Sequence, residues 1–300
     1  MKTFRSPLFV LFSLLMTAVG LGVVAGAADK MAPADLVAKH IAAIGSPDAR
    51  AKVSGTRIKG GFELIVKAGG TGTSEGQVVM ASHRDQNLVN MAYNSDEPAT
   101  SFRYDGSKTT VTQFRPGRHT PLEHFFHEHQ EIVSDGLVGG VLSEAWPLFK
   151  LQEKSPKLEY AGMKKIDGRQ AHALRYKPQK GSELSITLFF DAETFQHLRT
   201  EYEQTVYSTK QTRIPGSPGR LPSVTDQRSA PQRLTAYESF SDFRPEGGLN
   251  LPHVYKFELS VQSDVRPLLI SWTFNLSEFA FNAPLDKAEF VVGNETVKPD

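Results

Sequence analysis

Histidines are the residues best suited to bind a metal in this sequence, and His119, His124, His127 and His129 lie close together in the chain. If residues 123–131 form a helix, His124 and His127 lie on one face at a spacing that zinc or copper can use. The chain has neither a His-Glu-x-x-His motif nor a cysteine to complete a structural zinc site. We therefore interpret the stretch as a solvated, partly amphipathic segment and predict no bound metal; a weak metal site is the alternative.

A serine in a glycine-flanked motif is the second candidate for chemistry. Residues 72–76 (Gly-Thr-Ser-Glu-Gly) match the G-x-S-x-G nucleophile elbow, which supports catalysis only where a strand turns sharply into a helix. Residues 77–80 (Gln-Val-Val-Met) continue as a strand, so we expect Ser74 to lie in a hairpin. The sequence has no S-x-x-K motif and no Walker lysine. We predict no catalytic residues and no cofactor, and a hydrolase or metalloprotein ranks third among three functional hypotheses.

The N-terminus has the pattern of an export signal. Lys2 and Arg5 precede an apolar run at residues 8–24, and Ala25-Gly26-Ala27 offers the small residues that a signal peptidase requires. We predict a signal peptide at residues 1–27, cleaved after Ala27, and hence an exported, periplasmic protein. Because the apolar run is slightly long for a signal peptide, an uncleaved N-terminal membrane anchor is the alternative.

The composition of the exported chain excludes several kinds of protein. Without Lys2 and Arg5, 32 of the 34 basic residues remain against 33 acidic ones, so the net charge is −1 and nothing indicates a nucleic-acid partner. The absence of cysteine excludes disulfides and a lipid-modified N-terminal cysteine. The 19 phenylalanines can build a sizeable core. We expect residues 28–300 to form one soluble domain and a monomer.

Residues 157–207 have the pattern of an antiparallel meander. Apolar and polar residues alternate on both sides of Asp167-Gly168, a dipeptide that favours a tight hairpin, and again on both sides of a turn at residues 191–194. Such patterning predicts an antiparallel sheet with one buried face. Similar runs at residues 56–114 and 234–281 bring the total to about eleven or twelve strands. A shift of the alternation at Ser277-Glu278 predicts a β-bulge.

Helical spacing of apolar residues occurs twice. Residues 33–44 begin with a proline suited to a first helical turn, and His40 lies on their apolar stripe, where we interpret it as a packed side chain rather than a ligand. Residues 135–151 carry a broader stripe and predict a second helix. Glycines at 136, 139 and 140 weaken it by roughly 1 kcal/mol each compared with alanine, and Pro147 disturbs its last turn. This helix either plugs the concave side of the sheet as core, the favoured interpretation, or moves as a lid.

Residues 208–233 are rich in proline and carry an excess of basic residues. This composition predicts a mobile loop between two strands. A solvated loop is the default interpretation, and contact with anionic lipid or with a partner is the alternative.

Several local motifs resemble those of the LolA/LolB-like periplasmic lipoprotein carriers and of outer-membrane lipoprotein-sorting-protein-like chains. They are residues 104–106 (Tyr-Asp-Gly), 190–194 (Phe-Asp-Ala-Glu-Thr), the hairpin from 237–242 to 248–252, 278–282 (Glu-Phe-Ala-Phe-Asn), and 137–148, which is similar to one uncharacterised branch. The resemblance covers most of residues 33–290 as a pattern. It implies a mainly β fold with helices, namely an unclosed antiparallel β-barrel of about 11 strands with an N-terminal helix and a central helical lid or plug.

The same resemblance implies a hydrophobic cavity on the concave face, and we assign the carriers' functional arginine to no residue here. We predict a binding or carrier protein for lipid or acylated lipoprotein, acting in lipoprotein sorting and outer membrane biogenesis, with envelope membrane proteins as possible partners. A periplasmic sensor or scaffold of the same fold, without cargo transfer, is the alternative. The predicted cavity residues are Leu137, Val138, Val141, Leu142, Trp146, Phe149, Phe257, Trp272 and Phe274.

Overall fold

The computed structural model describes residues 31–112, 120–206, 209–214, 223–228, 232–262 and 267–291. The predicted signal peptide, His119 and parts of the predicted loop at 208–233 therefore lie outside the described residues.

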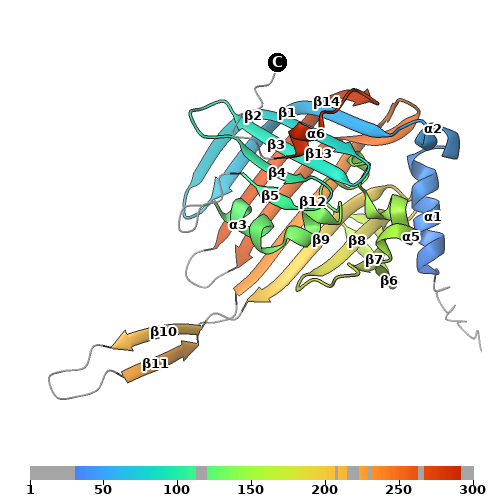
Figure 1. The fold of residues 1–300 in the computed structure, drawn as a ribbon. Helices are drawn as coiled ribbons and strands as arrows, with labels where there is room; N and C mark the ends of the chain where they lie inside the picture. The colour runs from blue at the N-terminus through green and yellow to red at the C-terminus, as the bar shows by residue number, and fades with distance from the viewer. Residues whose placement is uncertain are drawn as a thin grey trace, which may run out of the picture. The chain divides into compact units, whose positions relative to one another are not determined.

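The fold is built on a twelve-stranded antiparallel sheet in the order β5-β4-β3-β2-β1-β14-β13-β12-β9-β8-β7-β6 (Figure 1). Its first half contains β1 (Gly55–Lys67), β2 (Thr71–His83), β3 (Gln86–Tyr93), β4 (Thr100–Tyr104) and β5 (Thr109–Val111). The meander contains β6 (Lys157–Ile166), β7 (Arg169–Lys177), β8 (Ser185–Asp191) and β9 (His197–Val206). The last long strands are β12 (Gln232–Glu246), β13 (Leu249–Gln262) and β14 (Leu268–Phe281).

The helical elements are short apart from the first one. They are α1 (Pro33–Ile44), α2 (Pro47–Ala51), α3 (Pro121–Glu128), α4 (Gln130–Ser134), η1 (Gly140–Leu142), η2 (Pro147–Lys150), α5 (Leu151–Lys154) and α6 (Lys287–Phe290), where η denotes a 3-10 helix. None of the helices in the described ranges has the length and apolar character needed to span a membrane.

Local sequence signals account for most of these elements. The first helix has the predicted bounds, and the meander turns where predicted, because the Asp191 carboxylate accepts hydrogen bonds from the backbone N–H groups of Glu193 and Thr194. The predicted bulge is also confirmed. Lys59 pairs with Glu278 and Gly60 with Leu276, which leaves Ser277 as the extra residue of β14.

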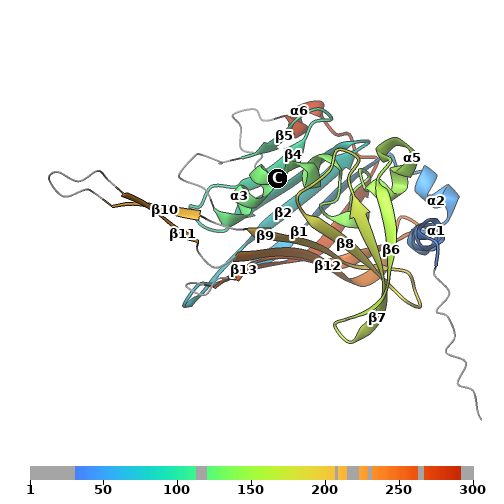
Figure 2. The same cartoon turned by 90° about the horizontal axis from the view of Figure 1, so that it is seen from below.

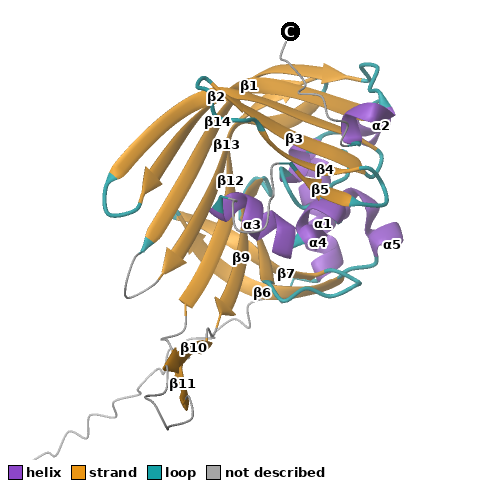
Figure 3. Ribbon diagram, turned by 60° about the vertical axis from the view of Figure 1, so that its left-hand side comes forward, coloured by secondary structure: helices purple, strands orange, loops and turns teal. Residues whose placement is uncertain are grey.

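The sheet is curved and does not close. In the described chain its two edges are β5 and β6, which do not pair with each other, so the predicted unclosed barrel is confirmed. Figure 3 shows α3 and α4 within the curve of the sheet, between its β1–β5 half and its β6–β9 half, and Figure 2 shows α3 there from another side. The largest hydrophobic cluster lies between these helices and the inner side chains of the strands. The core is therefore the space that the concave face and its cover enclose.

The predicted helix at residues 135–151 is wrong. The segment folds as turns, the 3-10 helices η1 and η2, and the start of α5. Its glycines adopt positive φ values, 80° at Gly136, 77° at Gly139 and 50° at Gly140, which a right-handed helix does not contain. A Cβ at Gly136 would lie 2.1 Å from the Ala145 carbonyl oxygen. The glycines thus permit sharp turns and close backbone approach, and the apolar side chains are buried without helical periodicity.

The loop predicted at residues 208–233 contains regular structure. Strands β10 (Thr209–Ile214) and β11 (Ser223–Arg228) pair as an antiparallel two-stranded sheet. Both strands contain β-branched residues, including Thr212, Ile214, Val224 and Thr225, which favour extended backbone. The loop prediction relied on proline content and charge instead of these β-branched residues, and it therefore missed the two strands. The mobility of the segment stays a prediction.

We expect Gly136→Ala to destabilise the fold more than Gly168→Ala. Both glycines have positive φ, 80° and 87°, but a Cβ at Gly168 meets nothing within 4 Å, whereas one at Gly136 collides with Ala145. The Gly168 variant should lose about 1 kcal/mol of unfolding free energy from backbone strain, and the Gly136 variant several times more. Urea denaturation measures both values. Equal losses would show that close approach at Gly136 is unimportant.

Candidate functional site

The candidate site is an apolar crevice on the concave face of the sheet. The crevice has a free volume of about 10 Å³, room for hardly one water molecule, because the side chains around it are packed together. They come from β3 and β4, from α3, from the turn after α4, and from β13 and β14. The lining residues are Val89, Met91, Phe102, Leu122, Phe126, Val138, Tyr255, Phe257, Trp272 and Phe274.

The predicted cavity residues fall into three groups. Val138, Phe257, Trp272 and Phe274 come together in the crevice. Leu137, Val141, Leu142 and Trp146 are buried in the core beside it, and the space beneath them is filled by other side chains. Phe149 is 37% exposed and lines a different depression on the surface.

That depression is an outer groove between α1 and the η2–α5 segment. It has a volume of about 660 Å³ and is lined on one side by Ala34, Ala38 and Ile41 and on the other by Leu148, Phe149 and Leu151. Its walls are therefore mostly apolar, as those of a ligand site are. The groove is open to solvent, so it differs in kind from the closed crevice.

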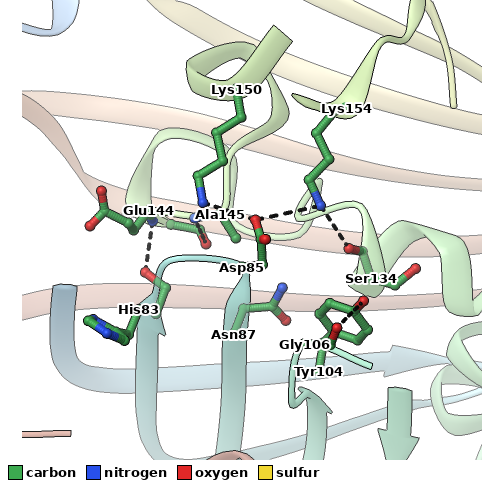
Figure 4. Close-up of polar contacts among 12 residues, drawn as sticks. His83, Asp85, Asn87, Tyr104, Gly106, Ser134, Glu144, Ala145, Lys150 and Lys154 are labelled. Atoms are coloured by element: carbon green, nitrogen blue, oxygen red, sulfur yellow. Dashed lines mark hydrogen bonds and ion pairs between the residues drawn. The ribbon is translucent and has the colours of Figure 1, made fainter. Parts of the chain in front are cut away.

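We call residues 137–149 the plug segment, because they fill the concave side of the sheet. Polar contacts hold its flanks to the turn between β2 and β3 (Figure 4). The Lys150 ammonium donates to the Asp85 carboxylate at 2.9 Å, and the Lys154 ammonium lies 3.8 Å from the same oxygen. The Asn87 amide donates to the Val133 carbonyl at 2.8 Å on the other flank. Burial alone raises the pKa of Asp85, but the hydrogen bond and charge of Lys150 outweigh it and lower that pKa.

The middle of the plug segment contacts two buried histidines. The Trp146 indole N–H donates to His40 Nε2 at 3.4 Å, and its ring stacks on His197 with centroids 5.0 Å apart. His40 Nδ1 in turn bonds to the Phe195 carbonyl at 2.9 Å. Burial lowers the pKa of His40 to about 4 and that of His197 well below its usual value. Both rings are therefore neutral at pH 7, and His40 is the packed side chain that the sequence predicted.

A buried acid connects the plug segment to the sheet. Glu238 on β12 is 0% exposed, and its Oε1 atom accepts hydrogen bonds from the Gly139 backbone N–H at 3.2 Å and the Tyr255 hydroxyl at 3.0 Å. Burial raises the pKa of Glu238 to about 8, although both hydrogen bonds oppose the shift. The carboxyl group is consequently protonated at pH 7.

The other chemical candidates do not converge on this site. His124 and His127 lie on α3, which follows the Thr120 capping box, whereas His129 is buried and bonds to Gln204 at 3.2 Å. No group of three or more potential metal ligands occurs in the described residues. Ser74 lies within strand β2, opposite Leu64, as the sequence predicted.

Sequence reasoning missed much of the crevice. Leu122 and Phe126 belong to α3, whose capping box and apolar spacing are signals of an amphipathic helix in the sequence. Tyr255 alternates with charged residues along β13, a pattern that places it on the inner face, but it was not among the predicted cavity residues. Glu238 carries no signal of its own in the sequence, because a glutamate between apolar strand residues usually faces solvent.

Acid is expected to destabilise the fold through His40. The unfolded imidazole titrates near pH 6.5 and the buried one near pH 4, so stability present above pH 6.5 is lost as the pH falls toward 4. His40→Gln retains a donor and an acceptor for Phe195 and Trp146. When the variant is unfolded in urea across this pH range, its unfolding free energy should depend less steeply on pH than that of the wild type, by up to about 1.4 kcal/mol per pH unit. An unchanged dependence would exclude His40 as its source.

Base is expected to destabilise the fold through Glu238. The unfolded carboxyl titrates near pH 4.5 and the buried one near pH 8, so its contribution is lost as the pH rises through this window. Between pH 6.5 and 8 the histidines are mostly neutral in the unfolded chain as well, so they add little pH dependence of the opposite sign. Here the unfolding free energy should fall by up to about 1.4 kcal/mol per pH unit, and Glu238→Gln should remove that slope. The same substitution at exposed Glu75 serves as the control; equal slopes in all three proteins would contradict the assignment.

Comparison with known proteins finds similarity at the level of structure. No model of a protein family matches the sequence, and no curated protein matches it. A LolA superfamily protein from Nitrosomonas europaea is 11% identical, with a TM-score of 0.46 over 87% of this chain and 97% of that one. A DUF1329 family protein from Desulfovibrio piger is 11% identical, with a TM-score of 0.40 over 86% and 96%. A domain assigned to the outer membrane lipoprotein-sorting proteins of Vibrio parahaemolyticus is 11% identical, with a TM-score of 0.38 over 85% and 95%. The structural neighbours thus include LolA superfamily proteins, at low sequence identity.

Proposed function

We propose that the protein is a non-enzymatic periplasmic carrier that binds acyl chains of lipids or lipoproteins in the apolar crevice and takes part in envelope lipoprotein sorting. The observation that carries the proposal is the crevice itself. Aromatic and aliphatic side chains from β3, β4, β13 and β14 converge there, and α3 and the plug segment cover them. Such a cover can be displaced without breaking the twelve-stranded sheet.

The crevice must open to accept a chain, because about 10 Å³ holds no acyl group. Two covering elements can move. Helix α3 places Leu122, Phe125 and Phe126 over the sheet, and the plug segment places Val138 there. Neither contains more than about two turns of regular helix, and neither is part of the hydrogen-bonded sheet. Such covering segments can open locally while the sheet stays folded.

The free energy of exposing the covering side chains is similar to that of burying an acyl chain, so the chain can replace the cover. Exposing the three apolar side chains of α3 costs roughly 1.5–3 kcal/mol each, or about 5–9 kcal/mol together. An acyl chain of about twelve carbons gains roughly 0.8 kcal/mol per buried methylene, or about 10 kcal/mol. The two terms are similar, so bound chain and closed cover are close in free energy. A carrier that must also release its cargo requires such a balance.

A scaffold or sensor of the same fold is the second candidate function. The observation that favours it is the closed crevice, since a fully packed concave face needs no cargo. The two functions differ in whether an acyl chain enters the fold, which is measurable.

The two tryptophans of the chain provide that measurement. Trp272 lines the crevice and Trp146 lies in the plug segment, so Trp146→Phe and Trp272→Phe each leave one fluorescent reporter. We expect a lysolipid with a dibrominated acyl chain to quench Trp272 strongly and saturably, because bromine quenches at contact. Quenching of Trp146 should be weaker. Native mass spectrometry of protein taken from the periplasm should show a bound lipid.

Substitutions separate the two candidate cavities. Val138→Asp places a charge in the crevice wall and should abolish quenching of Trp272, whereas Phe149→Ala in the outer groove should leave it unchanged. Circular dichroism confirms that both variants fold. Loss of binding in Phe149→Ala alone would assign the ligand to the outer groove. Absence of quenching and of co-purified lipid in the wild type would favour the scaffold function.

A further inference from the structure

The pairing of the strands places Glu238 of β12 next to the crevice. It pairs directly with Phe257 of β13, and Phe257 pairs with Trp272 of β14. Directly opposed residues of antiparallel strands point to the same face, so Glu238 shares the concave face with two walls of the crevice. Tyr255, a third wall residue, donates its hydroxyl hydrogen to Glu238. The acid therefore stands at the β12 end of an otherwise apolar site.

The cluster around Glu238 has unused hydrogen-bonding capacity. Its Oε1 atom accepts from Gly139 and Tyr255, but its Oε2 atom is buried without a hydrogen-bond partner in the described part of the chain. The hydroxyl of Tyr202 on β9 is likewise buried; it faces Glu238 and interacts with it, but without regular hydrogen-bond geometry. Buried polar atoms of folded proteins are nearly always satisfied, so such a pair requires an explanation.

Among the described residues no cation faces Glu238, which agrees with its neutral, protonated state in the closed structure. The groups that face it are the hydroxyls of Tyr202 and Tyr255 and the Gly139 backbone N–H, which come from β9, β13 and the plug segment. No lysine or arginine of the described chain forms an ion pair with it. Only Gly139 belongs to a covering element, so displacement of the plug segment frees a further acceptor site. A positively charged donor brought beside the opened cluster would favour the ionised form of Glu238.

We propose that Glu238, Tyr202 and Tyr255 form a head-group site at the end of the crevice, which selects amphiphiles with a primary ammonium group over those with a carboxylate. This inference rests on the proposed acyl-chain binding. With the chain in the crevice, an ammonium group donates hydrogen bonds to the carboxyl oxygens and to the Tyr202 oxygen. Its positive charge favours ionised Glu238, which releases its proton to solvent and becomes the counter-ion. A carboxylate head places a second acid beside Glu238, so either one of the two acids must stay protonated or two negative charges lie together in a buried site, which is unfavourable.

The test is a displacement experiment with ligands that differ only in the head. Dodecylammonium, dodecanol and dodecanoate, each below its micelle concentration, compete with the dibrominated lysolipid for Trp272 in the Trp146→Phe protein at pH 7. We expect dodecylammonium to restore fluorescence at a concentration about tenfold lower than dodecanoate, with dodecanol between them. Glu238→Gln should bring the two charged ligands within about twofold of each other.

The control is Glu258→Gln, the same change on the neighbouring strand. Glu258 lies on the other face of β13, where it pairs with Lys256 at 2.6 Å, so this variant should retain the wild-type preference. Tyr255→Phe, which removes one hydrogen bond to Glu238, is the second test variant and should reduce the preference if Glu238→Gln does not fold.

The outcomes separate this inference from the proposed function. Equal displacement by ammonium and carboxylate in the wild type, or an unchanged preference in both Glu238→Gln and Tyr255→Phe, overturns the head-group site while acyl binding stands. A preference lost equally in Glu258→Gln assigns it to general surface charge and also overturns the site. Failure of the brominated lysolipid to quench Trp272 at all removes both proposals.

Discussion

The structure depends on covering the concave apolar face of a sheet that does not close. A closed barrel buries its inner side chains against one another, but here the inner residues of β13 and β14 need side chains from outside the sheet. Residues such as Phe257 and Trp272 each contribute roughly 1.5–3 kcal/mol when removed from water. Helix α3 and the plug segment supply the contacts. Since both lie between the two halves of the sheet, they hold its curvature as well as its core.

The irregular backbone of the plug segment follows from this task. A regular helix keeps its backbone at the distance set by its side chains, whereas Gly139 lies so close to the sheet that a Cβ would be 2.6 Å from the Met80 side chain. Close approach of the plug-segment backbone to the sheet leaves no empty space between them, but it also buries backbone N–H groups. Glu238 satisfies one of them, and Ser82 satisfies that of Glu144 at 2.7 Å. The polar residues of the concave face are thus explained in part by the backbone that covers it.

The sequence predicted what local chemistry determines. Helix α1, the hairpin turns of the meander and the bulge at Ser277 depend on residues near in sequence, and each was predicted correctly. The backbone conformation of residues 135–151 was not predicted correctly. In the sequence its three glycines indicate only a weak helix, because their positive φ angles are set by contacts with residues distant in the chain. The crevice is harder still. Its lining brings together Val89 of β3 and Trp272 of β14, and Phe126 of α3 lies against Phe257 with ring centroids 5.5 Å apart. These arrangements follow from strand order and not from any local pattern.

Core and candidate binding site are therefore the same residues in this fold, and Glu238 is the residue at which the two roles differ. A face that needs only to be covered is better served by leucine at position 238, because an apolar side chain avoids the desolvation of a carboxyl group. The acid is instead placed where its hydrogen bonds reach the one covering segment that lacks regular structure. Closing the plug segment satisfies one of its oxygens, and opening it exposes both beside an apolar wall. A purely structural plug uses this acid for one backbone hydrogen bond. Under the proposed function, an amphiphile with a donating head and an apolar chain would replace the segment at both the polar and the apolar contacts.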